Sequence, residues 1–278
     1  MCGKTLLLCV SCLAAGSLPA QEISLQVNLA QRHYIMGEPV VMQFDLLNLT
    51  RERLFLGKGG GGDRLYVEVS KGSAVMDTLR PFNEAPIAGT FQLGPGDHVY
   101  RSAELDKWFP LLQEGKYLVN AVLVHDGVQY KSQKKSFDVV PGIRLQEGVQ
   151  MFSNRKNLQR VFRLVYWDRN QTEHLFLRVT DEPGNKVWDS IDLGTLLRTS
   201  PAKLDISPGG EVTVVHRATQ DAFIRTVLWS LPDSLEINER NQLIDPAISA
   251  SQRAKSMYNE MADEKAEQQK KKKWWKFW

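Results

Sequence analysis

The residues best equipped for chemistry stand at the end of the chain, where five lysines adjoin four aromatic residues. They are Lys270, Lys271, Lys272, Lys273, Trp274, Trp275, Lys276, Phe277 and Trp278. Ammonium groups pair with anionic head groups, and indole rings favour the boundary between lipid and water. Each lysine near an anionic surface contributes about 1 kcal/mol. We predict that this tail lies on an anionic membrane surface; a solvated end and an address read by a receptor are the alternatives.

The five histidines form no metal or catalytic motif in the sequence. None stands in His-x-His or His-Glu-x-x-His spacing: His33, His98, His125, His174 and His216 are scattered. His216 with Asp221 comes nearest to a catalytic pair, but a histidine at the end of a strand is more often a half-buried polar residue. No Gly-x-Ser-x-Gly nucleophile elbow occurs. We expect no catalytic residue, metal ligand or cofactor.

Two further features invite a binding function. The glycine-rich segment 57–63 lacks the Gly-Lys-Ser/Thr ending of a phosphate loop, and no helical pattern follows it. We expect a flexible loop between strands, exposed enough to touch a partner. The seven tryptophans raise the possibility of carbohydrate binding, since sugar rings stack on indoles, although most tryptophans pack in cores. Trp108, in an expected loop, is the candidate ligand contact.

The first 20 residues have the form of a secretory signal. Lys4 precedes the apolar stretch 6–15, which is too short to span a bilayer, and small residues lead to a cleavage site after Ala20. A lipoprotein anchored through Cys12 is the less favoured alternative, because the position three residues before it is a cysteine rather than the usual leucine. The cysteines of the chain all lie in this segment: Cys2, Cys9 and Cys12. A mature chain without cysteine must rely on apolar cores rather than disulfides.

The positive charge of the chain is concentrated at its ends. The whole chain has 35 basic and 32 acidic residues, a net charge of +3. Without Lys4 and the five tail lysines, 29 basic residues face 32 acidic ones, a net charge of −3 for residues 21–269. A mildly acidic body argues against nucleic-acid binding.

Short β-rich runs between glycine, proline and aspartate turns predict an antiparallel sandwich over residues 21–141. In the strand 41–47, alternate side chains on one face are all apolar and are expected in the core. The expected core residues are Met42, Phe44 and Leu46 here, and Tyr117, Val119, Ala121 and Leu123 in the closing strand. Asp126-Gly127 is a typical two-residue hairpin turn.

Three short motifs in this region carry a family resemblance: Gly37-Glu38-Pro39-Val40, Pro95-Gly96 and Gly115-Lys116-Tyr117. Over residues 23–140 the chain resembles bacterial immunoglobulin-like sandwiches, nearest to those of the bacterial intracellular proteinase inhibitors. The resemblance implies an Ig-like fold and a bacterial source, and protease inhibition only by analogy. The export signal departs from that family. An inhibitor would act through one loop, for which the candidates are 57–63 and 80–89.

The second half is expected to form another antiparallel β domain over residues 142–245. Its expected strands are 161–167, 174–180, 186–188, 202–206, 211–215 and 223–229. Residues 246–269 contain no proline beyond Pro246 and no glycine, and are expected to be helical. Five residues form an apolar stripe on that helix: Ala254, Met257, Tyr258, Met261 and Ala262. The helix would either dock on the second β domain or remain solvated, and the tail 270–278 follows it.

Together these features predict an exported, non-enzymatic, mainly β protein of a bacterial periplasm or cell envelope. We expect it to bind or scaffold, with an anionic membrane surface or an envelope polymer and a further protein as partners. A secreted protease inhibitor is one alternative. The other is a hydrolase whose site is assembled from residues scattered along the chain.

Overall fold

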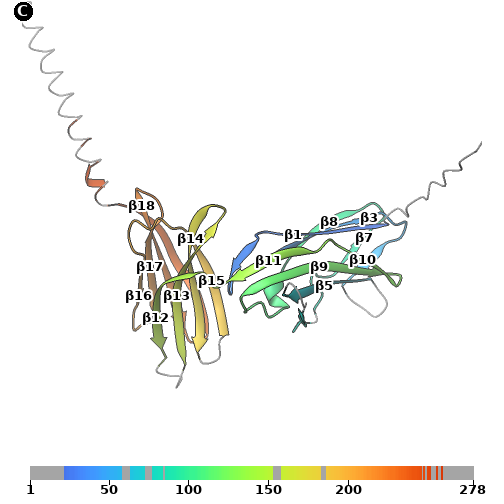
Figure 1. Ribbon diagram of the computed structural model, residues 1–278, viewed down its shortest axis with the longest axis horizontal. Coiled ribbons are helices and arrows are strands. Elements are labelled where there is room, and N and C mark those ends of the chain that lie inside the picture. The colour runs from blue at the N-terminus through green and yellow to red at the C-terminus, as the bar shows by residue number, and fades with distance from the viewer. Residues whose placement is uncertain are drawn as a thin grey trace, which may run out of the picture.

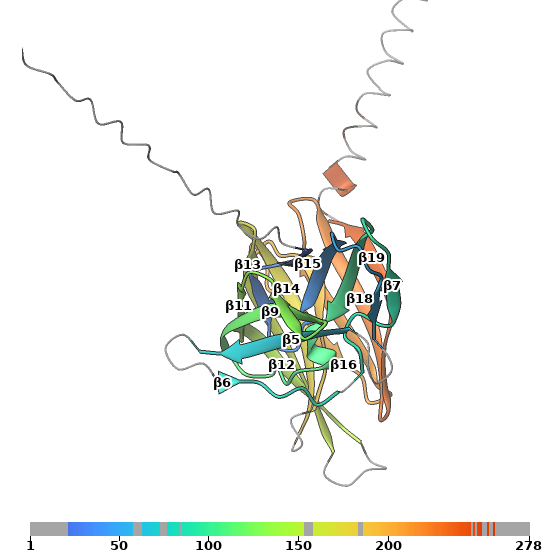
Figure 2. The ribbon, with the colours of Figure 1, turned by 90° about the vertical axis from the view of Figure 1, so that its right-hand side faces the viewer.

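The structure, a computed structural model, describes residues 22–57, 63–72, 77–83, 85–152, 158–182 and 186–245, followed by 247, 249–251, 255 and 258. The fold is mainly β, with 64% of the described residues in strands and 4% helical, which confirms the predicted fold class. Two groups of strands lie side by side in Figure 1 and overlap in the view of Figure 2, so they are stacked end to end. We call them the first sandwich (residues 23–140) and the second sandwich (residues 143–244).

The first sandwich contains two main sheets, ordered β1-β3-β8 and β2-β11-β9-β5-β6, with β10 paired to β9 and a small β4-β7 sheet beside them. Its elements are β1 (Ile23–Leu29), β2 (His33–Ile35), β3 (Val41–Asn48), β4 (Leu54–Leu56), β5 (Arg64–Lys71), β6 (Asp77–Thr78), β7 (Phe91–Leu93), β8 (His98–Glu104), the 3₁₀ turn η1 (Leu105–Lys107), β9 (Gly115–His125), β10 (Val128–Lys131) and β11 (Lys135–Val140). The pairing of β2 with β11 is parallel, whereas the other pairs of named strands are antiparallel.

The alternation of apolar residues places the core of the first sandwich correctly. All seven residues expected there are at most 1% exposed: Met42, Phe44, Leu46, Tyr117, Val119, Ala121 and Leu123. They lie between the two main sheets with the apolar residues of β1 and β11. The predicted hairpin at Asp126-Gly127 is confirmed as well, since it joins β9 to β10. Both turn residues have positive φ, 49° and 77°, as the twist of a two-residue hairpin requires.

The second sandwich contains two four-stranded sheets in which neighbours along the chain are neighbours in the sheet, β12-β13-β14-β15 and β16-β17-β18-β19. Its strands are β12 (Ile143–Met151), β13 (Gln159–Arg169), β14 (Thr172–Glu182), β15 (Lys186–Thr195), β16 (Lys203–Ile206), β17 (Glu211–Arg217), β18 (Ala222–Leu231) and β19 (Ser234–Ile244). The expected strands are all present, and the sequence pattern did not predict β12 or β19.

Two central strands of the second sandwich are apolar on both faces. Phe162 and Leu164 of β13 enter the core between the sheets, whereas Val165 points to the other side of the sheet. Phe176 of β14 does the same, and both outward residues pack on Ile35 of the first sandwich. A run of consecutive apolar residues indicates a strand that is covered on both faces. In this protein the first sandwich supplies the second cover.

Arg160 is a buried cation that holds the second sandwich together. Its side chain is 0% exposed and its Nε lies 2.8 Å from Oδ1 of Asp181, the residue opposite it on β14. Its remaining N–H groups donate to Ser230 Oγ and to the carbonyls of the β18–β19 turn: Leu231, Pro232 and Ser234. The guanidinium also lies 4.2 Å from the ring centroid of Trp188. One side chain of the first sheet therefore binds the turn of the second.

The described residues after Asp245 are helical, as predicted. They are 247, 249–251, 255 and 258. Tyr258 belongs to the apolar stripe, for which docking on the second β domain and exposure to solvent were the two alternatives, and it is 74% exposed. Among the described residues, no helix combines the length and the apolarity needed to cross a membrane. The rest of the predicted helix, the tail 270–278 and the predicted signal segment 1–20 lie outside the described residues.

His216 on β17 should make stability fall in acid. The sequence suggested a half-buried side chain, but His216 is 0% exposed and neither ring nitrogen has a hydrogen-bond partner of normal geometry. Burial and then the Arg240 guanidinium lower the pKa of His216 to about 4, opposed only in part by Thr195 and Asp192. Above pH 6.5 the ring is neutral in both states. Between pH 6.5 and 4 the unfolded chain binds a proton on His216 that the folded chain does not bind, so the unfolded state is favoured.

We therefore expect the free energy of unfolding to lose up to about 3 kcal/mol through His216 between pH 6.5 and 4. Urea unfolding at pH 7, 6, 5 and 4 measures this loss. His216→Leu should flatten the pH dependence between pH 6.5 and 4. Equal slopes for His216→Leu and the parent chain would contradict the assignment.

Candidate binding site

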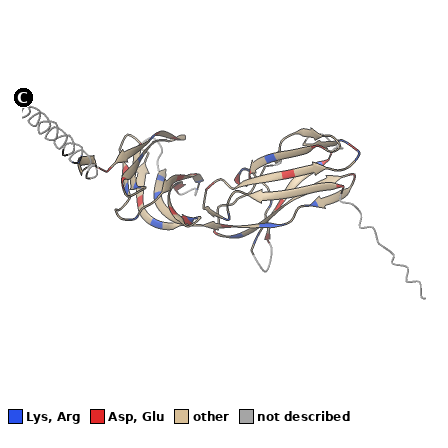
Figure 3. Cartoon of the chain, turned by 90° about the horizontal axis from the view of Figure 1, so that it is seen from above, with Lys and Arg blue, Asp and Glu red and all other residues tan. Residues whose placement is uncertain are grey.

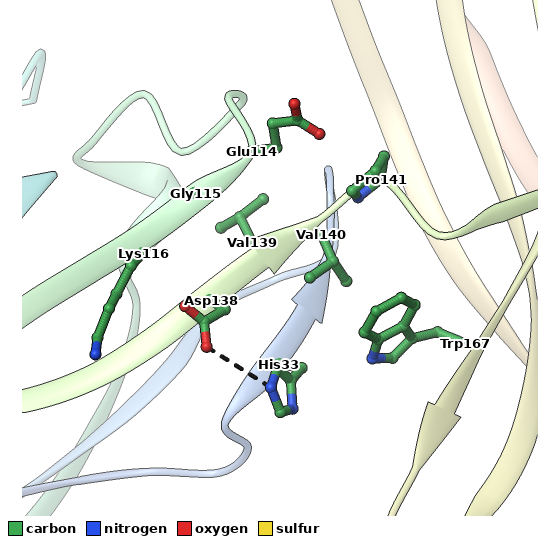
Figure 4. A pocket seen from close by; sticks show the side chains of 9 residues that line it. All are labelled: His33, Glu114, Gly115, Lys116, Asp138, Val139, Val140, Pro141 and Trp167. Atoms are coloured by element: carbon green, nitrogen blue, oxygen red, sulfur yellow. Dashed lines mark ion pairs between the residues drawn. The ribbon is translucent and has the colours of Figure 1, made fainter. Parts of the chain in front are cut away.

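A shallow cleft of about 530 Å³ opens where the two sandwiches meet. Its lining residues come from β2, the start of β9, the end of β11 and the end of β13. They are His33, Glu114, Gly115, Lys116, Asp138, Val139, Val140, Pro141 and Trp167. Figure 4 shows Trp167 approaching from the second sandwich toward His33 and Val140 of the first. The cleft therefore exists only because the sandwiches are docked.

Strand pairing determines the polar side of the cleft. The parallel register of β2 and β11 sets His33 opposite Asp138, so the two side chains share a face of the sheet. His33 Nε2 lies 3.6 Å from Asp138 Oδ2. The ring of Trp167 stands 6.3 Å from the imidazole of His33, centroid to centroid, and is inclined to it by 55°. An acidic group, an imidazole and an indole are thus grouped on one wall.

The cleft combines an apolar wall with charged side chains. Trp167, Val140 and Pro141 form an apolar wall, while Lys116, Glu114 and Asp138 place charges of both signs around it. The lining residues include no hydroxyl or thiol that could act as a nucleophile. An indole flanked by hydrogen-bonding groups is able to stack on one face of a sugar ring and to bind the polar substituents at the rim of that ring.

An ion-pair cluster fixes the two sandwiches beside this cleft. Arg169, two residues after Trp167, donates from Nη2 to both carboxylate oxygens of Glu38, each at 2.7 Å, and from Nη1 to Asp192 at 2.7 Å. His174 Nδ1 lies 3.1 Å from Asp192. Burial raises the pKa of Glu38, while the Ile35 N–H and then Arg169 favour the charged form. The cluster spans the domain junction and holds Glu38, whose side chain is only 10% exposed.

Close backbone approach completes the docking. Ser190 of β15 donates from its hydroxyl to the carbonyl of Met36, at 2.7 Å. Gly37 has a φ of 89°, and a Cβ placed on it would lie 2.5 Å from Val187 Cγ1. Only glycine fits that turn without displacing the second sandwich. The Gly-x-Pro-Val motif, recognised in the sequence as a strand opening, thus also forms the contact surface between the domains.

Trp108, the residue predicted to contact a ligand, has a packing position. It follows η1, is partly buried against the first core, and its Nε1 donates to the carbonyl of Ala85 at 2.9 Å. The Trp108 carbonyl accepts from the N–H of Phe82. Trp108 therefore braces the loop 80–89, of which the structure describes every residue except 84. That loop presents Phe82 at 65% exposure and is anchored by buried Ile87.

The remaining sequence-predicted sites are not brought together. Of the loop 57–63 the structure describes only the two ends, Gly57 and Asp63, and the tail 270–278 lies outside the described residues. His216 has Arg240 and Asp192 as its charged neighbours, not Asp221. The sequence pattern did not reveal the cleft, because His33 and Trp167 meet only through the β2–β11 pairing and the docking of the sandwiches. The apolar run in β13 was the available signal that a second face is covered.

The comparisons with family models and with curated proteins supply no function that could be transferred to these residues. Residues around the cleft, the ion-pair cluster and the loop 80–89 must therefore be interpreted from their own chemistry. A comparison of this chain with models of known protein families finds no match, and a search of curated proteins finds none either.

Proposed function

We propose that this chain is an exported, non-catalytic binding or scaffolding protein of the bacterial cell envelope, associated with an anionic membrane surface through residues 270–278. The observation that carries the proposal is the ion-pair cluster of Arg169, Glu38 and Asp192 between the two sandwiches. It turns two β-sandwiches into one stiff body, which is the property required of a scaffold. The linker between them is only Pro141 and Gly142.

The position of the two ends supports presentation away from a surface. The described chain leaves the second sandwich beside β18, whereas the β9–β10 turn lies at the opposite end of the molecule (Figure 1). Acidic and basic residues are interspersed along both sandwiches (Figure 3), and the concentrated positive charge of the sequence is in its tail. A membrane contact through the tail would leave the first sandwich and the interdomain cleft facing a partner or an envelope polymer.

The tail is expected to provide most of the membrane affinity. Five lysines at about 1 kcal/mol each would change partitioning by more than about a thousand-fold. Residues 21–278 should therefore sediment with anionic vesicles and not with neutral ones, and high salt should release them. Residues 21–269 should stay in the supernatant.

Two matched variants separate the contributions. Replacing the four tail aromatics by serine keeps the five lysines and should leave a weaker binding that is more sensitive to salt. Replacing three lysines of the β10–β11 region by glutamine should leave sedimentation unchanged; these are Lys131, Lys134 and Lys135. Vesicle binding that survives removal of 270–278 would refute the tail's role.

One observation favours a second candidate function, inhibition of a protease. The loop 80–89 is exposed yet braced, because Trp108 binds its backbone at Phe82 and at Ala85. Rigid exposed loops with an aromatic side chain at the surface bind protease clefts well, since little ordering entropy is lost. The truncation experiment separates the two functions: an inhibitor acting through this loop has no need of residues 270–278.

A further inference from the structure

Four side chains converge at the tip of the first sandwich farthest from the second. His125 ends β9, Asp126 begins the turn after it, and Glu52 lies in the segment between β3 and β4. Asp63 stands immediately before β5 and forms a bridge with Leu56. The segments are distant along the chain, so histidine spacing does not reveal the group.

The geometry leaves one nitrogen of His125 directed to the acids. Nδ1 lies 2.7 Å from Asp63 Oδ1, and this carboxylate is itself held by the N–H of Phe55 on Oδ2, at 2.8 Å. Nε2 lies 3.7 Å from Asp126 Oδ2, too far for a hydrogen bond. With Nδ1–H donating to Asp63, the lone pair is on Nε2. Ligand atoms of Glu52, His125 and Asp126 all lie within 4.8 Å of one another.

Burial distinguishes this histidine from an ordinary surface pair. The side chain of His125 is 9% exposed and that of Asp63 is 11% exposed, whereas Glu52 and Asp126 are open to solvent. Among the described residues, the Glu52 carboxylate has no ion-pair partner, and Asp126 has only the distant contact with His125. An oriented, nearly buried imidazole thus faces two carboxylates that lack a cation.

We propose that Glu52, His125 and Asp126 bind a divalent transition-metal ion of the zinc class, with Asp63 orienting the imidazole from behind. A carboxylate on the far nitrogen fixes the tautomer and raises the basicity of a metal-bound histidine. One imidazole and two carboxylates suit Zn²⁺, whereas Ca²⁺ prefers six to eight oxygen ligands. Three protein ligands leave a coordination position for water or for an oxygen of a partner.

Zinc titration of the full chain, followed by calorimetry, tests the proposal. Because thiols bind zinc by themselves, Cys2, Cys9 and Cys12 are replaced by serine in every arm. We expect one Zn²⁺ per chain, a higher melting temperature with zinc than with a chelator, and no displacement by an excess of Ca²⁺.

The variants distinguish ligands from bystanders. Glu52→Gln and Asp126→Asn should each lower zinc affinity at least ten-fold, and asparagine suits the positive φ of position 126. Asp63→Asn should lower it by about 10–100-fold without removing a ligand. The matched control is His98→Gln, in the same sandwich, where a histidine meets a single carboxylate, Asp45. The zinc affinity of His98→Gln should equal that of the parent chain.

Absence of zinc binding at millimolar concentration would overturn the proposal. Binding that is equally strong in the parent chain, Glu52→Gln and Asp126→Asn would overturn it as well. Both substitutions are at exposed side chains, so they are expected to fold even if Asp63→Asn does not. Melting curves in chelator show whether each variant is folded before zinc is added.

Discussion

Replacing Arg160 with methionine is expected to lower the free energy of unfolding by about 3–5 kcal/mol. The guanidinium is fully buried, and its loss leaves Asp181 as an uncompensated charge that is 9% exposed. The carbonyls of Leu231 and Pro232 lose their donors at the same time. Each buried acceptor without a partner adds to the loss. Because Arg160 joins β13 to the β18–β19 turn, we expect the second sandwich to unfold first.

Urea unfolding followed by tryptophan fluorescence measures this effect, since Trp188 stacks on the guanidinium. Arg163→Met is the matched control on the same strand. Arg163 also forms ion pairs, with Glu147 and Glu182, but these carboxylates are 35% and 43% exposed. Arg163→Met should lower the free energy of unfolding by no more than about 1 kcal/mol. A double variant with Asp181→Leu should recover part of the stability. Equal losses at positions 160 and 163 would contradict the assignment.

Replacing Arg169 with leucine is expected to weaken the docking of the two sandwiches by about 2–5 kcal/mol. The substitution leaves the carboxylates of Glu38 and Asp192 without their shared cation at the junction. Each sandwich keeps its own core, because Arg169 lies outside both. We therefore expect a more variable separation of two folded sandwiches rather than unfolding.

Small-angle scattering and hydrogen exchange of residues 35–38 report that separation. The matched control is Arg198→Leu: Arg198 also makes a two-point ion pair, with Glu173, and also stacks on an aromatic ring, Tyr166, but it is 52% exposed. It should change neither measurement. Gly37→Ala offers an independent route, because the added Cβ would meet Val187. Unchanged scattering in both Arg169→Leu and Gly37→Ala would show that other contacts dominate the docking.

Sequence patterns predicted the core strands well but missed two edge strands. The β3 core follows from strict alternation, because one face is buried and the other is more exposed. In β9 the predicted face is in the core, but Asn120 and Val122 on the opposite face are buried as well. The strands β12 and β19 lie at sheet edges and are mostly exposed, so no burial pattern marks them. Polar residues such as Glu236 and Arg240 of β19 suit an edge that must not pair with another chain.

The sites escaped sequence reasoning for a different reason. Arg160 and Asp181 are partners because a two-residue turn at Asn170-Gln171 sets the register of β13 on β14. Once this turn is located in the sequence, counting outward from it along both strands predicts that Arg160 pairs with Asp181. The His125 group and the interdomain cleft depend on contacts between segments far apart in the chain, for which spacing carries no information.

The parallel pairing of β2 with β11 has a consequence for how the molecule forms. His33 pairs across to Asp138, so the first sandwich closes only after more than a hundred residues have been made. The second sandwich, by contrast, is built from hairpins between neighbouring strands. Folding slows as contacts join more distant parts of the chain. We therefore expect the second sandwich, which is synthesised last, to fold fast. The first sandwich is synthesised first but folds more slowly, so its folding limits the rate at which the whole molecule forms.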